Sequence, residues 1–325
     1  MSDDDLWFLP GPIEDEAPLP RSDRQSPVDP GTWLTAQAGL ALPLARAAQA
    51  LGALDAHVAG DQGMIRRLAM IEVEAMLWAE GTPLPREDIG RDLMAGRASS
   101  DRQVMAKARW ALRRLEGQAD PADLRSFLAL HRAHDPAETG RAAGDSFDAA
   151  ARDFAALIAS PALHPLTRAA MALSAWPLTG LSPDEDLAEA AVFAGRIAAA
   201  DLELLPFAPL GQAGRRIWRQ SGTPETRLAA WLDTIRDGAQ RARAEAIRLD
   251  DWAARARAST ARLKGDTSAR VIAALRAAPL MTTEMVEIEI GASRDTAERM
   301  LAKLHQMGLI REITGTRRFR LWTAP

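Results

Sequence analysis

Apolar residues recur at helical spacing through most of the chain. From residue 40 to residue 263 they fall three or four positions apart in successive segments, separated by Gly, Pro or acidic residues, a pattern typical of amphipathic helices. β-branched alternation is confined to the far C-terminus, so the predicted fold class is mainly α. The expected helices cover residues 40–58, 63–81, 99–117, 121–134, 146–158, 165–176, 186–205 and 226–263, the last of them bent or divided in two.

Breaks in this pattern divide the chain into four predicted parts. These are an acidic proline-rich arm, an N-terminal helical region, a helical core and a C-terminal domain, at residues 1–31, 32–134, 135–265 and 266–325. The arm contains six prolines, which exclude a regular helix. We expect its apolar patch, residues 6–9, to dock on the protein's own surface, with partner capture or disorder as the alternatives.

The composition of the chain excludes several kinds of site but does not indicate a catalytic activity. The 325 residues include no cysteine, which excludes disulfides and thiolate metal sites, and no apolar run approaches the 18 or so residues of a membrane helix. A cytoplasmic protein without a membrane partner is expected. His131 and His134 lie three residues apart, but an exposed pair is a simpler interpretation than a metal site, so neither a metal nor another cofactor is predicted.

The last sixty residues predict a winged helix-turn-helix domain. Their local signals are a helix that Pro279 stops, a helix between Thr282 and Gly291, and a helix that begins after Ser293 and closes at Gly308. Two β-prone segments, residues 309–313 and 319–323, then flank a turn at residues 314–317. Helix, helix, glycine turn, helix and hairpin is the order of a winged helix.

Basic residues of this domain predict contact with double-stranded DNA. Its third helix can bury a face of apolar residues at helical spacing, which are Ala297, Met300, Leu301, Leu304 and Met307. This leaves Arg294, Thr296, Arg299 and Lys303 facing outward, toward the major groove of a bound duplex. The wing is expected to meet phosphate or the minor groove through Arg317, Arg318 and Arg320. A homodimer on a twofold site is expected. A protein-docking surface, and a solvated face on which Asp295 and Glu298 pair with the arginines, are the alternatives.

Other cationic and aromatic residues have simpler interpretations. The arginines of residues 226–263 are expected to form either a solvated face or a second surface that contacts the phosphates of DNA. Asp250 and Asp251 shift the helical register within this segment. The tryptophans, among them Trp78, Trp110, Trp176 and Trp252, are expected to pack in the core or between helices.

Three stretches carry a resemblance to the Fic (filamentation induced by cAMP) family. ARAAQALGALDAHVAGDQGMIRRLAMIEVEAMLWAEGTPLPREDI resembles the family's N-terminal region, whose inhibitory helix ends with Ser or Thr, three residues and Glu-Gly; Glu80 and Gly81 match, whereas Met76 replaces the hydroxyl residue. LHPLTRAAMALSAW is similar to the helix before the active loop, and TGTRRFRLWTAP to the end of the winged domain. The chain also resembles a plasmid-associated alphaproteobacterial family of helix-turn-helix proteins.

The sequence departs from the family where its chemistry resides. The Fic loop HPFxxGNGR supplies a proton-accepting His, phosphate-binding amides and an Arg. After Trp176 this chain reads PLTGLSPDEDLAEAAVFAGRIAAADL, without His or Gly-Asn-Gly and with three acids at the expected phosphate positions. The resemblance therefore implies a fold, and Glu80 becomes a helix-end acid while His164 is expected to cap or pack.

The predicted function is that of a sequence-specific DNA-binding protein, a transcriptional regulator. Its body is predicted to be a degenerate, catalytically inactive Fic-like pseudoenzyme that serves dimerisation or partner binding. A protein-docking scaffold is one alternative. The other is a nucleotide-transferring enzyme with an altered loop, which would bind nucleotide near Ser182 to Asp186.

Overall fold

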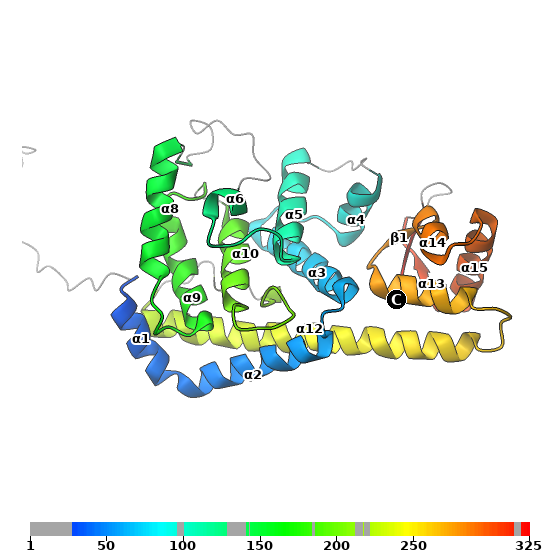
Figure 1. Ribbon diagram of the computed structural model, residues 1–325, viewed down its shortest axis with the longest axis horizontal. Coiled ribbons are helices and arrows are strands. Elements are labelled where there is room, and N and C mark those ends of the chain that lie inside the picture. The colour runs from blue at the N-terminus through cyan, green and yellow to red at the C-terminus, as the bar shows by residue number, and fades with distance from the viewer. Residues whose placement is uncertain are drawn as a thin grey trace, which may run out of the picture.

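The protein is built almost entirely from helices, which confirms the predicted class (Figure 1). A computed structural model describes residues 28–95, 101–128, 141–142, 144–183, 186–211, 217, 222–314 and 320–325. Before residue 261 the elements are α1 (Pro30–Gly39), α2 (Ala41–Val58), α3 (Gln62–Glu80), α4 (Arg86–Ala95), α5 (Arg102–Leu115), α6 (Leu124–Leu128), α8 (Gly144–Ile158), α9 (Pro165–Ala175), the 3-10 helix η2 (Trp176–Leu178), α10 (Leu187–Ala198) and α12 (Pro224–Thr260).

Two long helices form the base of the molecule. α2 and α12 pack side by side along its length, and α3, α5, α9 and α10 lie above them in Figure 1. α12 is a single helix, so the alternative of two helices is wrong. Asp250 remains helical because its carboxylate turns outward and pairs with Arg276 of the C-terminal domain and with His57 of α2. The predicted helices at 40–58, 63–81, 99–117, 146–158 and 165–176 are confirmed as α2, α3, α5, α8 and α9.

A buried aromatic cluster fills the centre of the helical body. The ring of Phe193 in α10 contacts Phe127, Phe154 and Trp176, with ring centroids 5.0 to 5.8 Å apart. Trp110 stacks edge-on against Phe127 and donates its indole N–H to the Phe127 carbonyl at 2.8 Å. These contacts tie α5, α6, α8 and α10 into one core.

Two expectations about this body are wrong. The helix predicted over residues 186–205 ends at Ala198, because the buried Asp55 carboxylate accepts hydrogen bonds from three backbone N–H groups in a turn, those of Glu203, Leu204 and Leu205. A carboxylate that satisfies three amides competes directly with helix continuation. The other error is Trp78, which is expected to pack in the core or between helices but is 53% exposed on α3.

A second buried carboxylate anchors the end of the same connection. Glu72 of α3 accepts hydrogen bonds from the N–H groups of Leu210 and Gly211, at 3.0 and 2.8 Å. Burial raises the pKa of Glu72 to about 7, against the opposing effect of the two amides. Asp55 and Glu72 together fix a segment that has no regular structure of its own over most of its length.

The last sixty residues form three helices and a small antiparallel sheet. The predicted hairpin is confirmed, since β2 (Arg311–Glu312) and β3 (Leu321–Thr323) are antiparallel, and β1 (Met281–Thr282) adds a third strand to give the order β1-β3-β2. The helix caps are also as predicted, with Thr282 and Ser293 at N-termini and left-handed Gly291 after the second helix. The elements are α13 (Thr267–Ala277), β1 (Met281–Thr282), α14 (Thr283–Ile290), α15 (Arg294–Gln306), β2 (Arg311–Glu312) and β3 (Leu321–Thr323).

Close contacts hold this domain against the helical body. The buried Arg67 of α3 donates to the carbonyl oxygens of Leu275 and Ala278, at 3.0 and 3.2 Å, at the end of α13. Arg276 pairs with Asp61 and with Asp250, so one guanidinium joins α13 to both α3 and α12. These hydrogen bonds and ion pairs therefore fix the C-terminal residues against the helical body.

Several predicted features lie outside the described residues. They are the arm up to residue 27, the pair His131 and His134, and the wing arginines Arg317 and Arg318. Within the described ranges, no helix combines the length and the apolar character needed to cross a membrane.

Candidate functional site

α15 presents the side chains predicted to read DNA. Ser293 caps the helix by accepting from the N–H of Thr296, and Ala297, Leu301 and Leu304 form its buried face. The opposite face exposes three of the four predicted residues, while Thr296 is half-buried. Met307, expected on the buried face, is 39% exposed because the helix ends at Gln306. The exposed predicted residues are Arg294, Arg299 and Lys303.

The two arginines of this face carry their own counterions. Arg294 pairs with Glu298 at 2.9 Å, and Arg299 with Asp295 at 3.0 Å. The hydrogen bond from Arg294 to Glu298 raises the pKa of the guanidinium. Both arginine side chains are 72% exposed, and exposed i,i+4 pairs are weak. Either guanidinium can therefore exchange its carboxylate for a stronger bidentate partner.

The neighbouring helix α14 is acidic. α14 contains Glu284, Glu287 and Glu289, so α14 and α15 together hold more carboxylates than Lys and Arg. Between these glutamates Ile288 is 74% exposed. Over residues 266–325 nine Lys and Arg residues outnumber seven Asp and Glu residues. This positive balance therefore comes from outside α14 and α15, including Arg317, Arg318 and the exposed Arg320.

The predicted cationic surface on α12 is partly paired. Arg241 lies 3.8 Å from Asp237, and Arg248 pairs with Glu245 at 2.6 Å. Three further arginines are exposed and make no ion pair within the part of the chain that the structure describes; they are Arg243, Arg255 and Arg257. α12 thus offers single cations rather than a continuous basic stripe.

The start of α10 is the position that the Fic resemblance assigns to phosphate. There the Glu80 carboxylate, at the end of α3, accepts from the backbone N–H of Ala188 at 2.7 Å. Asp186 accepts from the N–H of Glu189 at 3.3 Å. Two of the protein's own carboxylates therefore occupy the amides with which a helix N-terminus binds an anion.

Lys107 of α5 compensates these buried acids. Its Nζ lies 3.1 Å from Glu80 and 3.3 Å from Asp186. Burial alone would lower the pKa of Lys107, but the charges of Asp186 and Glu80 raise it. Burial raises the pKa of Glu80 despite its Lys107 partner. The arrangement is a closed internal ion-pair cluster.

A second buried network lies one helical turn further on. Glu189 pairs with Arg141, and both side chains are at most 2% exposed. Ser182 also donates to Glu189 and accepts the indole N–H of Trp176 at 2.8 Å. The Ser182 hydroxyl therefore makes both of these hydrogen bonds within the protein. It lies in the segment where an altered loop would bind nucleotide.

His164 has a structural role. His164 is the N-cap of α9, its Nδ1 accepting from the N–H of Leu166 at 3.1 Å, as expected. Burial lowers the pKa of its imidazole. Among the described residues no three His, Cys, Asp or Glu side chains form a group suited to a metal ion.

Sequence reasoning missed Lys107, Arg141 and Glu189. Glu80 and Lys107 are 27 positions apart, and Arg141 and Glu189 are 48 positions apart. No local sequence pattern indicates that residues at such separations form ion pairs. The excess of acids after Trp176 was the available signal, since buried acids require cationic partners.

Comparison with known proteins supports the fold. No family model and no curated protein matches the sequence. The chain is similar to the crystal structure of a Fic family protein from Desulfovibrio desulfuricans G20, with a TM-score of 0.50 and 15% sequence identity, over 87% of this chain and 96% of that one. At this identity the similarity shows the fold alone. The chain has a Fic-like, mainly helical fold.

Proposed function

We propose that this protein is a sequence-specific DNA-binding protein, a transcriptional regulator, whose Fic-like body is catalytically inactive. The observation that carries the proposal is α15: a capped helix in a winged-helix topology that exposes Arg294, Arg299 and Lys303 on one side. Its weak internal ion pairs leave the guanidiniums available to guanine O6 and N7.

Alanine at Arg294 or Arg299 is expected to lower affinity for the cognate DNA by about tenfold to a hundredfold, with a smaller effect on random DNA, because a base contact is lost. Fluorescence anisotropy with both DNAs measures the effect. Arg241→Ala is the matched control, since Arg241 is also exposed, helical and near an acid at i,i+4. Equal losses in all three variants would assign the effect to net charge alone.

We also propose that the body transfers no nucleotide. Glu80 and Asp186 occupy the amides at the start of α10, and the segment after Trp176 lacks a histidine. Incubation with labelled ATP and candidate target proteins is expected to leave no label above background. Stable labelling that disappears in a Ser182→Ala variant would support the altered-loop enzyme instead.

A protein-docking scaffold is the second candidate, and Ile288 favours it. A large apolar side chain that is 74% exposed among glutamates suits a protein surface better than a phosphate backbone. If docking is the function, Ile288→Asp will abolish partner capture, and the parent protein will show no salt-sensitive affinity for DNA. If DNA binding is the function, Glu287→Gln will tighten binding by removing repulsion near α15.

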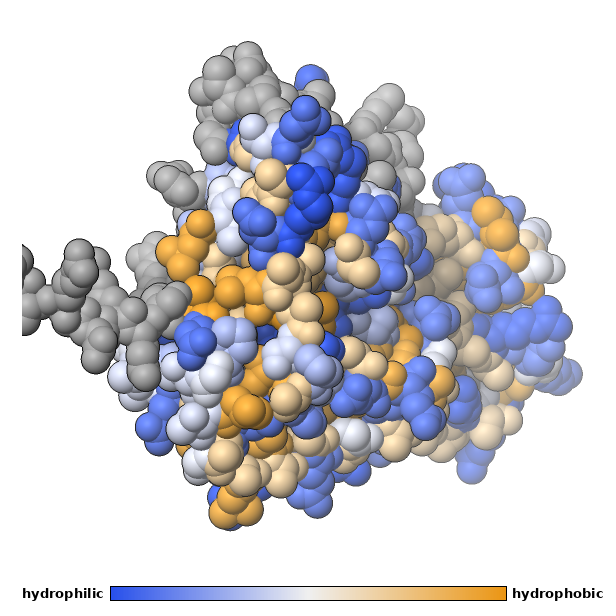
Figure 2. Space-filling view, turned by 60° about the vertical axis from the view of Figure 1, so that its left-hand side comes forward, coloured by the Kyte–Doolittle hydropathy of each residue, from blue (hydrophilic) through white to orange (hydrophobic). Residues whose placement is uncertain are grey.

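The helical body offers a surface for the homodimer that a twofold DNA site requires. The end of the molecule with α1, α8 and α9 has hydrophobic patches between hydrophilic ones (Figure 2). Leu34, Leu42 and Leu178 are exposed on α1, α2 and η2. Sedimentation at rising concentration is expected to detect a dimer that Leu42→Glu weakens; a monomer throughout would exclude this contact, leaving the arm or a different protein partner.

A further inference from the structure

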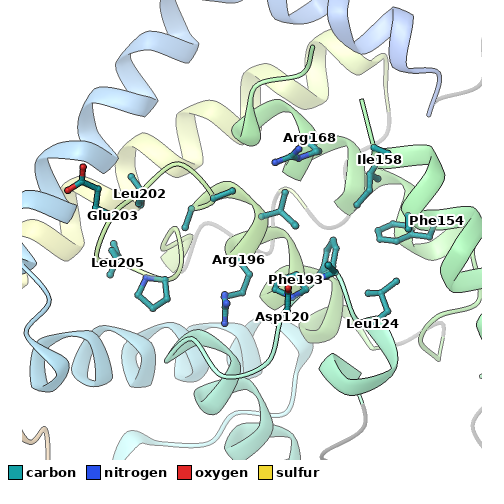
Figure 3. A pocket seen from close by; sticks show the side chains of 18 of the residues that line it. Asp120, Leu124, Phe154, Ile158, Arg168, Phe193, Arg196, Leu202, Glu203 and Leu205 are labelled. Carbon is teal, nitrogen blue, oxygen red and sulfur yellow. Dashed lines mark hydrogen bonds between the residues drawn. The ribbon is translucent and has the colours of Figure 1, made fainter. Parts of the chain in front are cut away.

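A cavity of about 560 Å³ opens in the helical body, away from α15 and from the start of α10. It lies between α8, α9, the C-terminal half of α10 and the turn at residues 199–206 (Figure 3). This volume is typical of pockets that bind small molecules.

The walls of the cavity are mainly apolar. Phe154 of α8 and Phe193 of α10 stand at its inner side with ring centroids 5.4 Å apart. Both rings belong to the buried core, so the accessible apolar lining comes from residues that are less buried, which are Ile197, Leu202 and Leu204. Such walls favour a hydrocarbon or aromatic group over water.

Two arginines interrupt this apolar lining. Arg168 reaches the cavity from α9 and Arg196 from α10, on different sides in Figure 3. The Nε of Arg168 is buried and has no hydrogen-bond partner among the described residues. Arg196 donates one N–H to the carbonyl oxygen of Arg114, which holds the guanidinium in place. Burial lowers the pKa of Arg196, a sign that its charge is poorly solvated.

The acids at the rim form no close ion pair with these arginines. The charge of Asp120 acts on Arg196 from beyond ion-pair distance and raises its pKa, which only partly offsets the effect of burial. Glu203 is exposed, and its carboxylate points away from the cavity in Figure 3. Within the described part of the chain, neither arginine takes part in an ion pair of 4.0 Å or less. Two unpaired guanidiniums beside apolar walls call for an anion with an apolar body.

We propose that this cavity binds an amphipathic carboxylic acid, its carboxylate held by the guanidinium of Arg168 and its hydrocarbon part against Ile197, Leu202 and Leu204. The planar fork of a guanidinium matches a carboxylate in bidentate geometry. Inorganic phosphate would leave the apolar walls in contact with water, and a neutral alcohol would leave the arginines unpaired. The site goes beyond the proposed DNA binding and does not depend on it.

Isothermal titration of the full chain with decanoate, decanol and inorganic phosphate tests this site. Decanoate is expected to bind with one-to-one stoichiometry, at least tenfold more tightly than decanol, and phosphate is expected not to bind. In Arg168→Met the affinity for decanoate should fall at least tenfold while that for decanol stays unchanged. Arg152→Met is the matched control, since Arg152 is exposed on α8 and lies outside the cavity lining.

Three results would overturn the proposal: no saturable decanoate binding, equal affinity for decanol, or undiminished binding in Arg168→Met. Arg168→Lys provides a second variant that retains the positive charge but not the fork, and it should bind decanoate with intermediate affinity. Thermal unfolding of each variant in the absence of ligand identifies any loss that comes from misfolding.

Discussion

Replacing Glu189 by Ala is expected to reduce the free energy of unfolding by about 3–5 kcal/mol, as for other buried ion pairs that lose one partner. Arg141 would remain as a charge without a counterion inside the body, because its side chain is 2% exposed. Ser182 would lose an acceptor in the same change. Urea denaturation followed by circular dichroism measures the difference.

Two further variants distinguish a buried charge effect from a packing defect. Arg141→Met combined with Glu189→Met removes both charges, so the double variant is expected to cost less than the sum of the two single changes. Arg125→Ala, which breaks an exposed pair with Asp148 at 2.7 Å, should cost less than about 1 kcal/mol. Additive losses in the double variant would contradict the account of this network.

Gly63→Ala is expected to destabilise the protein by about 3 kcal/mol, although helix propensity alone would favour Ala by about 1 kcal/mol. A Cβ at this position in α3 would overlap the carbonyl oxygen and the Cα of Ala277, at the end of α13. The C-terminal domain would have to move away from the body. Thermal unfolding should then show lower stability and a separate transition for the displaced domain.

Gly52→Ala is the matched control for this steric effect. Gly52 is also within a helix, α2, and a Cβ there would meet no atom within 4 Å. We therefore expect this change to be neutral or slightly stabilising. A stabilising Gly63→Ala would contradict the close contact between α3 and α13.

Features fixed by neighbouring residues could be predicted from the sequence. Thr282 and Ser293 begin helices because their hydroxyl groups accept from amides three residues on, and Gly291 ends one because it adopts a left-handed conformation. The outward face of α15 followed from helical periodicity. His164 as a cap followed from its place beside Pro165.

Features fixed by distant residues could not be predicted. The end of α10 and the following turn depend on Asp55, about 150 residues earlier in the chain. The closure of the α10 N-terminus depends on Glu80, which is 108 residues away from Ala188. The cavity arises from four segments that only the folded chain brings together. Periodicity identifies a buried face but does not identify the partner that covers it.

We expect the C-terminal residues to bind DNA through α15 and the wing. An anisotropy titration of the full chain measures this binding, with DNA from around its own gene and with scrambled DNA, each at two salt concentrations. We expect tighter binding to the first DNA, affinity that falls with salt, and a salt slope about two units smaller for Arg317→Ala combined with Arg318→Ala. Absence of saturable binding at low salt, or identical binding by the parent and the wing variant on both DNAs, would contradict this expectation.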